Sequence, residues 1–338
     1  METRIRELIK KGYVGNPAQL ASVRRVTVSE GKAHGTGIIE VRTAGGLELD
    51  VLPDAGLDLG QCRFAGVNMS WMSKNGYDNP SAITQYEEEF SNTFPGGLLY
   101  TCGLRNAGPA NRDGNEWHPI HGRYHSHRAD NIRAEVEGDE IIVSGTVRET
   151  ALFGHNLEVK RTIRIDAFGA RINVEDKITN LAPADEEIML IYHCNFGYPM
   201  VSEKAHLELP EGHKTIPRTD FARTGLGREL EFDTPTAGEE ERVFFHEMGE
   251  TGDFSAKLVN PDVGASMSLS WSGDTLPVLA HWRCMASGDY VLGLEPTNCY
   301  IMGRHAERKN GTLKVLKAFE TVVNNVTIEF KKVLDNAF

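Results

Sequence analysis

Short runs in which apolar and polar residues alternate cover most of the chain after residue 22. Examples are 37–44 (GIIEVRTA), 140–150 (EIIVSGTVRET) and 157–166 (LEVKRTIRID), with turn signals such as 137–139 (EGD) between them. A period of two residues is typical of antiparallel strands that bury one face. Because helical patterns are scarce, the sequence predicts an all-β fold of stacked antiparallel sheets, a sandwich or barrel.

The amino terminus has a different period. Ile5, Leu8 and Ile9 follow helical spacing, and the pattern stops at Gly12, so we expect a short amphipathic helix within an arm over 1–22. This helix packs either on the body or on a neighbouring subunit, which leaves a homo-oligomer open. Since no linker divides the remaining residues, 23–338 are predicted to form a single domain.

The segment 211–250 has little strand pattern and is rich in Pro, Thr and Gly. We interpret it as a long excursion from the sheets, of the kind that often carries binding residues. The acidic stretch GEEER at 238–242 within it is interpreted as a solvated loop.

Composition narrows the classes of partner. The chain has 36 Lys and Arg against 48 Asp and Glu, a net charge of -12, which repels nucleic acids and anionic membranes. The first 20 residues contain no apolar run of the length of a secretion signal or a membrane span, so a cytoplasmic location is expected. The five cysteines are widely spaced without a CxxC pair, which is typical of reduced, buried thiols.

Four of the 12 histidines lie in HPIHGRYHSH at 118–127. On an unbroken strand His125 and His127 would point to one side, while His118 and His121 would point to opposite sides. This spacing matches no common zinc pattern, so we expect no metal and no cofactor, although a metal at His118, His125 and His127 is left open. His121 differs from the others because a glycine follows it, and such a glycine often marks a bulge or a place where a ligand approaches the backbone.

Three further stretches contain candidate chemistry. Arg105 and Asn106 precede a glycine turn and offer donors suited to sugar hydroxyls or a carboxylate, unless they simply form a surface turn. His193 lies in an apolar strand, either as a hydrogen-bonded core residue or as a buried proton donor. Glu295 ends the apolar run YVLGLEP at 290–296. It either faces water or lies in a pocket, where burial would raise its pKa and make it a workable base.

Taken in order, these motifs resemble those of the aldose 1-epimerase, or galactose mutarotase-like, superfamily. The motifs are LRNAG at 104–108 with IHG at 120–122, YHCNFG at 192–197 and GLEPTN at 293–298. The chain is most similar to a less characterised branch of that superfamily, on the stretches DAGLDLGQCRFAG at 54–66, LPVLAHW at 276–282 and GRH at 303–305.

The resemblance implies a β-supersandwich of antiparallel sheets with an open cleft for a monosaccharide. It implies that Glu295 is the general base that removes the proton of the anomeric hydroxyl, and that His193 is the general acid that protonates the ring oxygen. His121 would hydrogen-bond the sugar on its ring-oxygen side. Arg105 and Asn106 would bind hydroxyls.

The superfamily often has an aspartate beside an aromatic residue, and here the stretches PRTDFAR (217–223) and VFFHEM (243–248) offer Asp220 and His246 in its place. We therefore include His246 among the candidate substrate-binding residues, together with Arg123, Arg304 and His305. Should Arg105, Arg123 and Arg304 share the cleft, they would favour an acidic or phosphorylated sugar.

The sequence thus predicts a cofactor-independent isomerase of the aldose 1-epimerase type that acts on a small sugar. Two alternatives stay open. A His and Glu pair beside a sugar can also move a proton at carbon, which would give isomerisation or epimerisation at another ring position. A protein with this fold can also bind carbohydrate without turnover.

Overall fold

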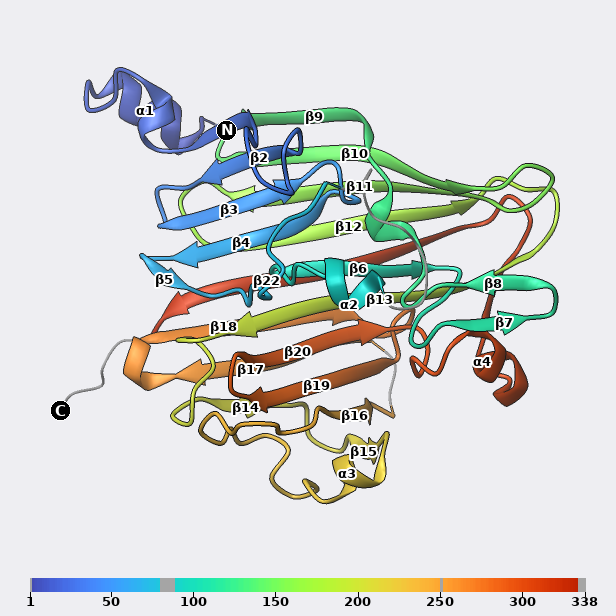
Figure 1. Cartoon of the computed structure of the whole chain (residues 1–338). Helices are drawn as coiled ribbons and strands as arrows, with labels where there is room; N and C mark the ends of the chain where they lie inside the picture. The colour runs from blue at the N-terminus through green and yellow to red at the C-terminus, as the bar shows by residue number, and fades with distance from the viewer. Residues whose placement is uncertain (1, 80–88, 250–251, 334–338) are drawn as a thin grey trace.

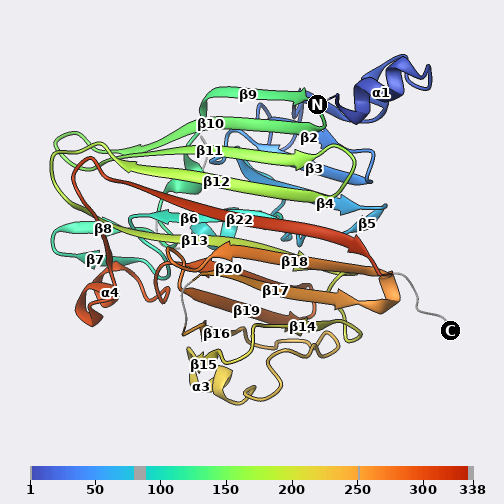
Figure 2. The same ribbon diagram turned by 180° about the vertical axis from the view of Figure 1, so that it is seen from behind.

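The computed structural model describes residues 2–79, 89–249 and 252–333 of the chain. Two large antiparallel sheets lie face to face (Figure 1), and Figure 2 shows the second of them from behind. The predicted all-β sandwich with a short amino-terminal helix is confirmed.

The first sheet has 12 strands. Along its main path the strands are β1 (Ser22–Thr27), β2 (Gly37–Arg42), β3 (Leu47–Leu52), β4 (Asp58–Phe64), β6 (Leu99–Leu104), β13 (Glu186–Gly197), β20 (Asp289–Thr297), β19 (Val278–Ala286), β16 (Arg242–Glu247) and β15 (Lys214–Pro217). Two short strands pair beside this path, β5 (Val67–Asn68) with β4 and β21 (Lys314–Leu316) with β13.

The second sheet has eight strands. In order they are β14 (His206–Glu208), β17 (Asp253–Asn260), β18 (Ala265–Ser272), β22 (Thr321–Lys332), β12 (Arg171–Asn180), β11 (Asn156–Asp166), β10 (Glu140–Thr150) and β9 (Asp130–Glu137). A separate hairpin pairs β7 (Asn111–Asp113) with β8 (Glu116–His118).

Helices are short throughout the described residues. The α-helices are α1 (Arg4–Lys10), α2 (Glu89–Thr93), α3 (Asp220–Arg223) and α4 (Arg304–Asn310), and the 3₁₀ turns are Pro17–Gln19, Tyr124–Ser126 and Pro261–Val263. None of the described helices has the length and apolar character needed to cross a membrane.

The alternating pattern of the sequence corresponds to sheets that bury one face. In β11 the side chains of Ile163 and Ile165 are fully buried between the sheets, whereas Arg164 between them is exposed. Burial of each such aliphatic side chain contributes roughly 1.5–3 kcal/mol to folding. The main apolar core therefore fills the space between the two sheets.

Strand β13 buries both of its faces. Leu190, Tyr192 and Cys194 belong to the core between the sheets. Met189 and Ile191 belong to a smaller apolar cluster on the outer face of the first sheet, where α2 lies in front of β6 and β13 (Figure 1). This second cluster forms the floor on which the candidate site is built.

The division into an arm over 1–22 and one domain over 23–338 stays a prediction. Ile5 of α1 and Ala21 are buried in the same apolar cluster as the sheets. All five cysteines are free and buried, as expected.

Three sequence interpretations need correction. The stretch 118–127 is not an unbroken strand, because His118 ends β8, His121 has a φ of 56°, and Tyr124–Ser126 form a 3₁₀ turn. The segment 211–250 contains β15, α3 and the whole of β16, and its last residue, Glu250, lies outside the described residues. The stretch GEEER is only partly solvated, because the Glu239 side chain is 13% exposed and pairs with Arg242.

Candidate active site

A hollow opens on the outer face of the first sheet. Glu295 reaches it from β20, His193 from β13, and His121 from the loop after β8. The structure thus brings together three side chains that are far apart in the sequence. The other described residues that line this pocket are Phe90, Phe94, Arg218, Glu241, Val243, Trp282 and Ile301.

Glu295 is buried without a hydrogen-bond partner for Oε1 among the described residues. Burial raises the pKa of its carboxyl to about 8. The charge of Arg218 opposes this increase, and the charge of Glu241 raises the pKa further. Gly293 provides the room, because a Cβ at that position would lie 2.6 Å from Glu295 Oε1. At neutral pH this carboxyl is therefore mostly protonated.

His193 lies next to this carboxyl. Its Nε2 is 3.2 Å from Glu295 Oε1, although the two groups are not aligned as a hydrogen bond. Burial lowers the pKa of His193 to about 4, and Asn195 partly opposes this shift. Asn195 also donates from Nδ2 to the His193 carbonyl and to Gly97 O, both at 3.0 Å. Asn195 therefore orients the strand segment that presents the imidazole.

His121 is held by its own backbone. Gly103 N donates to His121 O and His121 N donates to Gly108 O, each at 2.9 Å. The backbone N–H of Gly108 also points at His121 Nδ1 at 3.4 Å, which leaves the hydrogen of the neutral ring on Nε2. Burial, followed by the nearby His193, keeps the pKa of His121 well below its ordinary value. His121 is thus a neutral hydrogen-bond donor.

Gly122 is required beside this histidine. Its φ is 74°, and a Cβ there would lie 2.3 Å from Gly103 O. Gly122 therefore allows two backbone segments to pack closely, and this packing, rather than a ligand, explains the glycine after His121.

Arg105 and Asn106 lie outside the described lining of the pocket. Arg105 donates to Glu186 Oε1 at 3.0 Å and pairs with Glu116. Asn106 is fully buried and donates to Pro119 O at 2.7 Å, which joins the segment after β6 to the start of the loop that carries His121. Their polar groups are occupied by the protein itself, so the structure gives them a role in holding this loop.

Arg304 and His305 also lie away from the pocket. Arg304 is buried and donates to Glu186 Oε1 and Glu187 Oε2, both at 3.1 Å, while Asp113 lies 3.4 Å away. His305 is exposed on α4, with its Nδ1 3.6 Å from Asp113.

The two remaining candidates for substrate binding lie elsewhere as well. Arg123 donates to Trp117 O at 3.3 Å. His246 is fully buried beside Thr215 and His281, at 3.0 and 3.2 Å. The expectation of an acidic or phosphorylated sugar required Arg105, Arg123 and Arg304 to share the cleft, and the structure places none of the three in the described lining of the pocket.

The remaining histidines of the 118–127 stretch do not gather around one point. His118 is buried at the end of β8 with Glu116 3.9 Å from its Nε2, whereas the ring of His125 stacks on Tyr100 at 4.8 Å. Burial lowers the pKa of His118 to about 4 and that of His125 to about 3. In the described parts of the chain, no group of three or more His, Cys, Asp or Glu side chains is arranged to hold a metal ion.

Sequence reasoning missed the residues at the rim of the pocket. Arg218 precedes the aspartate that was considered in PRTDFAR, Glu241 is part of GEEER, and Trp282 ends LPVLAHW. Each stretch was noticed, but nothing local indicates that it turns toward the two histidines. The pairing of β16 with β15 and β19 brings the three together.

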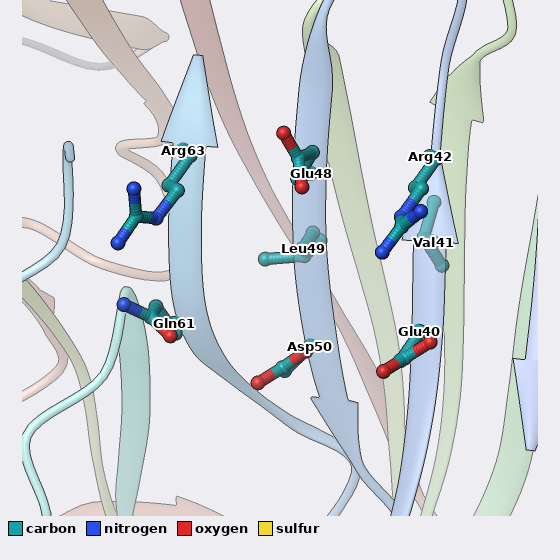
Figure 3. A pocket seen from close by; sticks show the side chains of 8 residues that line it. All are labelled: Glu40, Val41, Arg42, Glu48, Leu49, Asp50, Gln61 and Arg63. Atoms are coloured by element: carbon teal, nitrogen blue, oxygen red, sulfur yellow. The ribbon is translucent and has the colours of Figure 1, made fainter. Parts of the chain in front are cut away.

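A second hollow lies on the same face of the first sheet, over β2, β3 and β4 (Figure 3). Charged side chains form cross-strand rows there, with Glu48 between Arg42 and Arg63. Asp50 accepts a hydrogen bond from the Tyr77 hydroxyl at 3.0 Å, and burial raises its pKa. Among the described residues, the side chains that line this hollow come from the strands and include no histidine, so they offer no acid–base pair like that of Glu295 and His193.

The fold is similar to that of galactose mutarotase-like β-sandwich proteins. A structure from Klebsiella pneumoniae, described as a proposed aldose 1-epimerase, is similar at a TM-score of 0.87 and 24% identity over 93% of this chain and 84% of that one. A galactose mutarotase-like protein from Clostridium acetobutylicum has a TM-score of 0.65 and 16% identity over 93% and 99%. The galactose 1-epimerase of Lactobacillus acidophilus has a TM-score of 0.61 and 15% identity over 92% and 99%.

The sequence itself identifies the family of the chain. The family model described as a domain of unknown function (DUF4432) matches residues 33–330, so the chain belongs to this family. A search of curated proteins with the sequence finds no match.

Proposed function

We propose that this protein is a cofactor-independent enzyme of the aldose 1-epimerase type, which interconverts the anomers of a monosaccharide by general acid–base catalysis. The observation that carries the proposal is the buried contact between Glu295 and His193. A carboxyl and an imidazole 3.2 Å apart, both open to one pocket, can exchange protons with two oxygens bonded to the same carbon. The anomeric hydroxyl and the ring oxygen of an aldose are such a pair.

The proposed reaction needs one proton removed and one proton added. Glu295 accepts the proton of the anomeric hydroxyl while His193 donates a proton to the ring oxygen, so that the bond between C1 and the ring oxygen breaks and a carbonyl forms. The carbonyl then rotates about the bond between C1 and C2. Reversal of both proton transfers closes the ring as the other anomer. His121, as a neutral donor, hydrogen-bonds the sugar on its ring-oxygen side.

The resting pair must first be rearranged. Burial favours the uncharged forms, because it raises the pKa of Glu295 to about 8 and lowers the pKa of His193 to about 4. The shared proton therefore rests on the carboxyl and moves to His193 when sugar hydroxyls hydrogen-bond the carboxylate. The active state carries one proton on the pair. Activity is therefore expected between about pH 4 and about pH 8 and should fall above about pH 8, where the pair loses this proton.

The decisive test compares anomer exchange in the wild-type protein with that in Glu295→Gln. Freshly dissolved aldoses, a panel of pentoses, hexoses and deoxy sugars, are followed by polarimetry and exchange NMR in D₂O. We expect acceleration by the wild type and a loss of about 10²- to 10⁴-fold in the variant. Glu240→Gln, an exposed neighbour of the pocket rim, serves as the matched control and should retain the wild-type rate.

The same spectra separate the two alternatives. A protein that only binds sugar would shift resonances without accelerating exchange. An enzyme that acts at another ring carbon would incorporate deuterium at carbon, whereas anomer exchange exchanges only hydroxyl protons. Either result, or a Glu295→Gln variant as active as the wild type, would refute the proposed activity.

A further inference from the structure

Three side chains at the rim of the pocket are joined by hydrogen bonds. Arg218 follows β15, Glu241 precedes β16, and Trp282 lies in β19. Arg218 Nη2 donates to Glu241 Oε1 at 2.6 Å, and Trp282 Nε1 donates to Glu241 Oε2 at 2.8 Å. We refer to these three residues as the Arg218–Glu241–Trp282 set.

This set faces the reacting groups directly. Trp282 lies with its ring centroid 5.4 Å from that of His193, at an interplanar angle of 72°. Arg218 is close enough to lower the pKa of both Glu295 and His121. A sugar that contacts Glu295 and His193 must therefore also lie against Arg218 and the indole.

The charge of Arg218 is balanced before any ligand arrives. Glu241 uses both of its carboxylate oxygens, one for the guanidinium and one for the indole N–H, so it is held in place as an anion. The other guanidinium nitrogens of Arg218 make no hydrogen bond with a described residue. They remain available to hydroxyl oxygens, which do not have to displace a carboxylate.

An anionic ligand would meet a different environment. A uronate or phosphate group that approached Arg218 would compete with Glu241 for the guanidinium and would lie beside the Glu241 carboxylate. Like charges placed together in a partly desolvated site are strongly unfavourable. The other arginines considered for an anion, Arg105 and Arg304, are paired with carboxylates elsewhere.

We propose that the Arg218–Glu241–Trp282 set determines the charge selectivity of the pocket, so that it accepts uncharged sugars and disfavours their uronate and phosphate forms. The inference rests on the proposed function in taking this pocket as the sugar site. It adds that Glu241 is the residue that prevents Arg218 from binding an anion. Removal of the Glu241 charge should therefore convert Arg218 into an anion-binding group.

The test measures binding rather than turnover. Dissociation constants are determined by calorimetry and ligand-observed NMR for neutral hexoses, each matched with its uronate and its 6-phosphate. We expect the wild type to bind neutral members more tightly than charged ones. In Glu241→Gln the ratio of affinities should shift toward the charged members by about tenfold or more. Glu240→Gln, which removes the same charge one residue away, should leave the ratio unchanged.

Each outcome bears on the inference. Tighter binding of uronates or phosphates by the wild type would overturn it, and so would equal ratios in Glu241→Gln and Glu240→Gln, or the absence of binding to every sugar in both series. The salt dependence of the Glu241→Gln ratio gives an independent check, because a new contact between Arg218 and an anion should weaken as salt rises. Binding with the expected ratios but no anomer exchange would refute the proposed activity alone.

Discussion

Two groups of buried ionisable side chains lie on opposite faces of the first sheet, and they differ in how completely they are hydrogen-bonded. Between the sheets, Arg161 donates to Asp176 Oδ1 and Oδ2 at 2.8 and 2.7 Å and to Asp58 Oδ1 at 2.7 Å. In the pocket, Glu295 Oε1 makes no hydrogen bond with a described residue. Consecutive residues of β13 reach the two groups, because the Tyr192 hydroxyl donates to Asp176 and His193 faces Glu295.

The difference separates a structural charge cluster from a candidate catalytic one. Buried charges that serve the fold are paired and hydrogen-bonded, since an unpaired one is costly. A buried carboxyl left open toward a hollow keeps a raised pKa and a free oxygen, and both are needed for proton transfer. Arg161 and Glu295 are both buried, so burial does not distinguish the structural group from the candidate catalytic one. The Glu295 oxygen that lacks a hydrogen-bond partner does.

The largest expected effect comes from breaking the paired group. In Arg161→Met, Asp58 and Asp176 lose their counterion inside the core, where burial already raises the pKa of Asp58 to about 6. We expect the free energy of unfolding at pH 7 to fall by about 3–5 kcal/mol, measured by denaturant titration. A variant in which Asp58 and Asp176 are also replaced by Leu should recover much of this loss, because the uncompensated charges are gone. An unchanged midpoint for Arg161→Met would show that the cluster does not stabilise the fold.

The open group should respond in the opposite direction. The folded-state pKa of Glu295, about 8, lies above its ordinary value of 4.5. The contribution of Glu295 to the stability of the folded state is therefore fully present below about pH 4.5 and is lost as the pH rises through about 8. Glu295→Gln cannot ionise. It should therefore be more stable than the wild type near pH 9, by the ~1–3 kcal/mol that a buried unsatisfied group costs, and nearly equal to it at pH 4.5.

Thermal unfolding of the wild type and Glu295→Gln across this pH range measures the difference. The groups that face Glu295 are His193, Arg218 and Glu241, and all three are retained in the variant. A constant difference between the two proteins from pH 4.5 to pH 9 would contradict the raised pKa of Glu295.

The sequence was informative wherever the physical cause is local. Strands such as 140–150 and 157–166 were predicted because each buries one face and so alternates. Strand β6 was missed, since all six of its residues are buried and no alternation results. The three residues that the family motifs single out, Glu295, His193 and His121, do line one pocket, although their catalytic roles remain a proposal.

Long-range pairing explains the residues that sequence reasoning misplaced. Arg105 precedes a glycine turn and has donors suited to a ligand, but its partner Glu186 is 81 positions further along the chain. The pairing of β6 with β13 brings the two segments together, and no local pattern encodes that pairing. Arg218 and Glu241 were overlooked for the converse reason, because they look like solvated loop residues until β15 and β16 join the first sheet.

The smallest effect on sugar binding is expected at Arg105, where the prediction tests whether the guanidinium holds the loop or binds the sugar. Arg105→Gln removes the pairs with Glu186 and Glu116. Because Glu116 is 42% exposed and can be rehydrated, we expect a loss of only about 1–3 kcal/mol of unfolding free energy.

The dissociation constant for a neutral sugar should stay within about twofold, since ~0.4 kcal/mol is the most that such a change represents. His305→Ala, on the exposed side of the same ion-pair region, is the control and should change stability by less than ~0.5 kcal/mol. A variant of Arg105 with unchanged stability and a tenfold weaker sugar affinity would reverse the assignment, because the guanidinium would then contact the ligand rather than the loop.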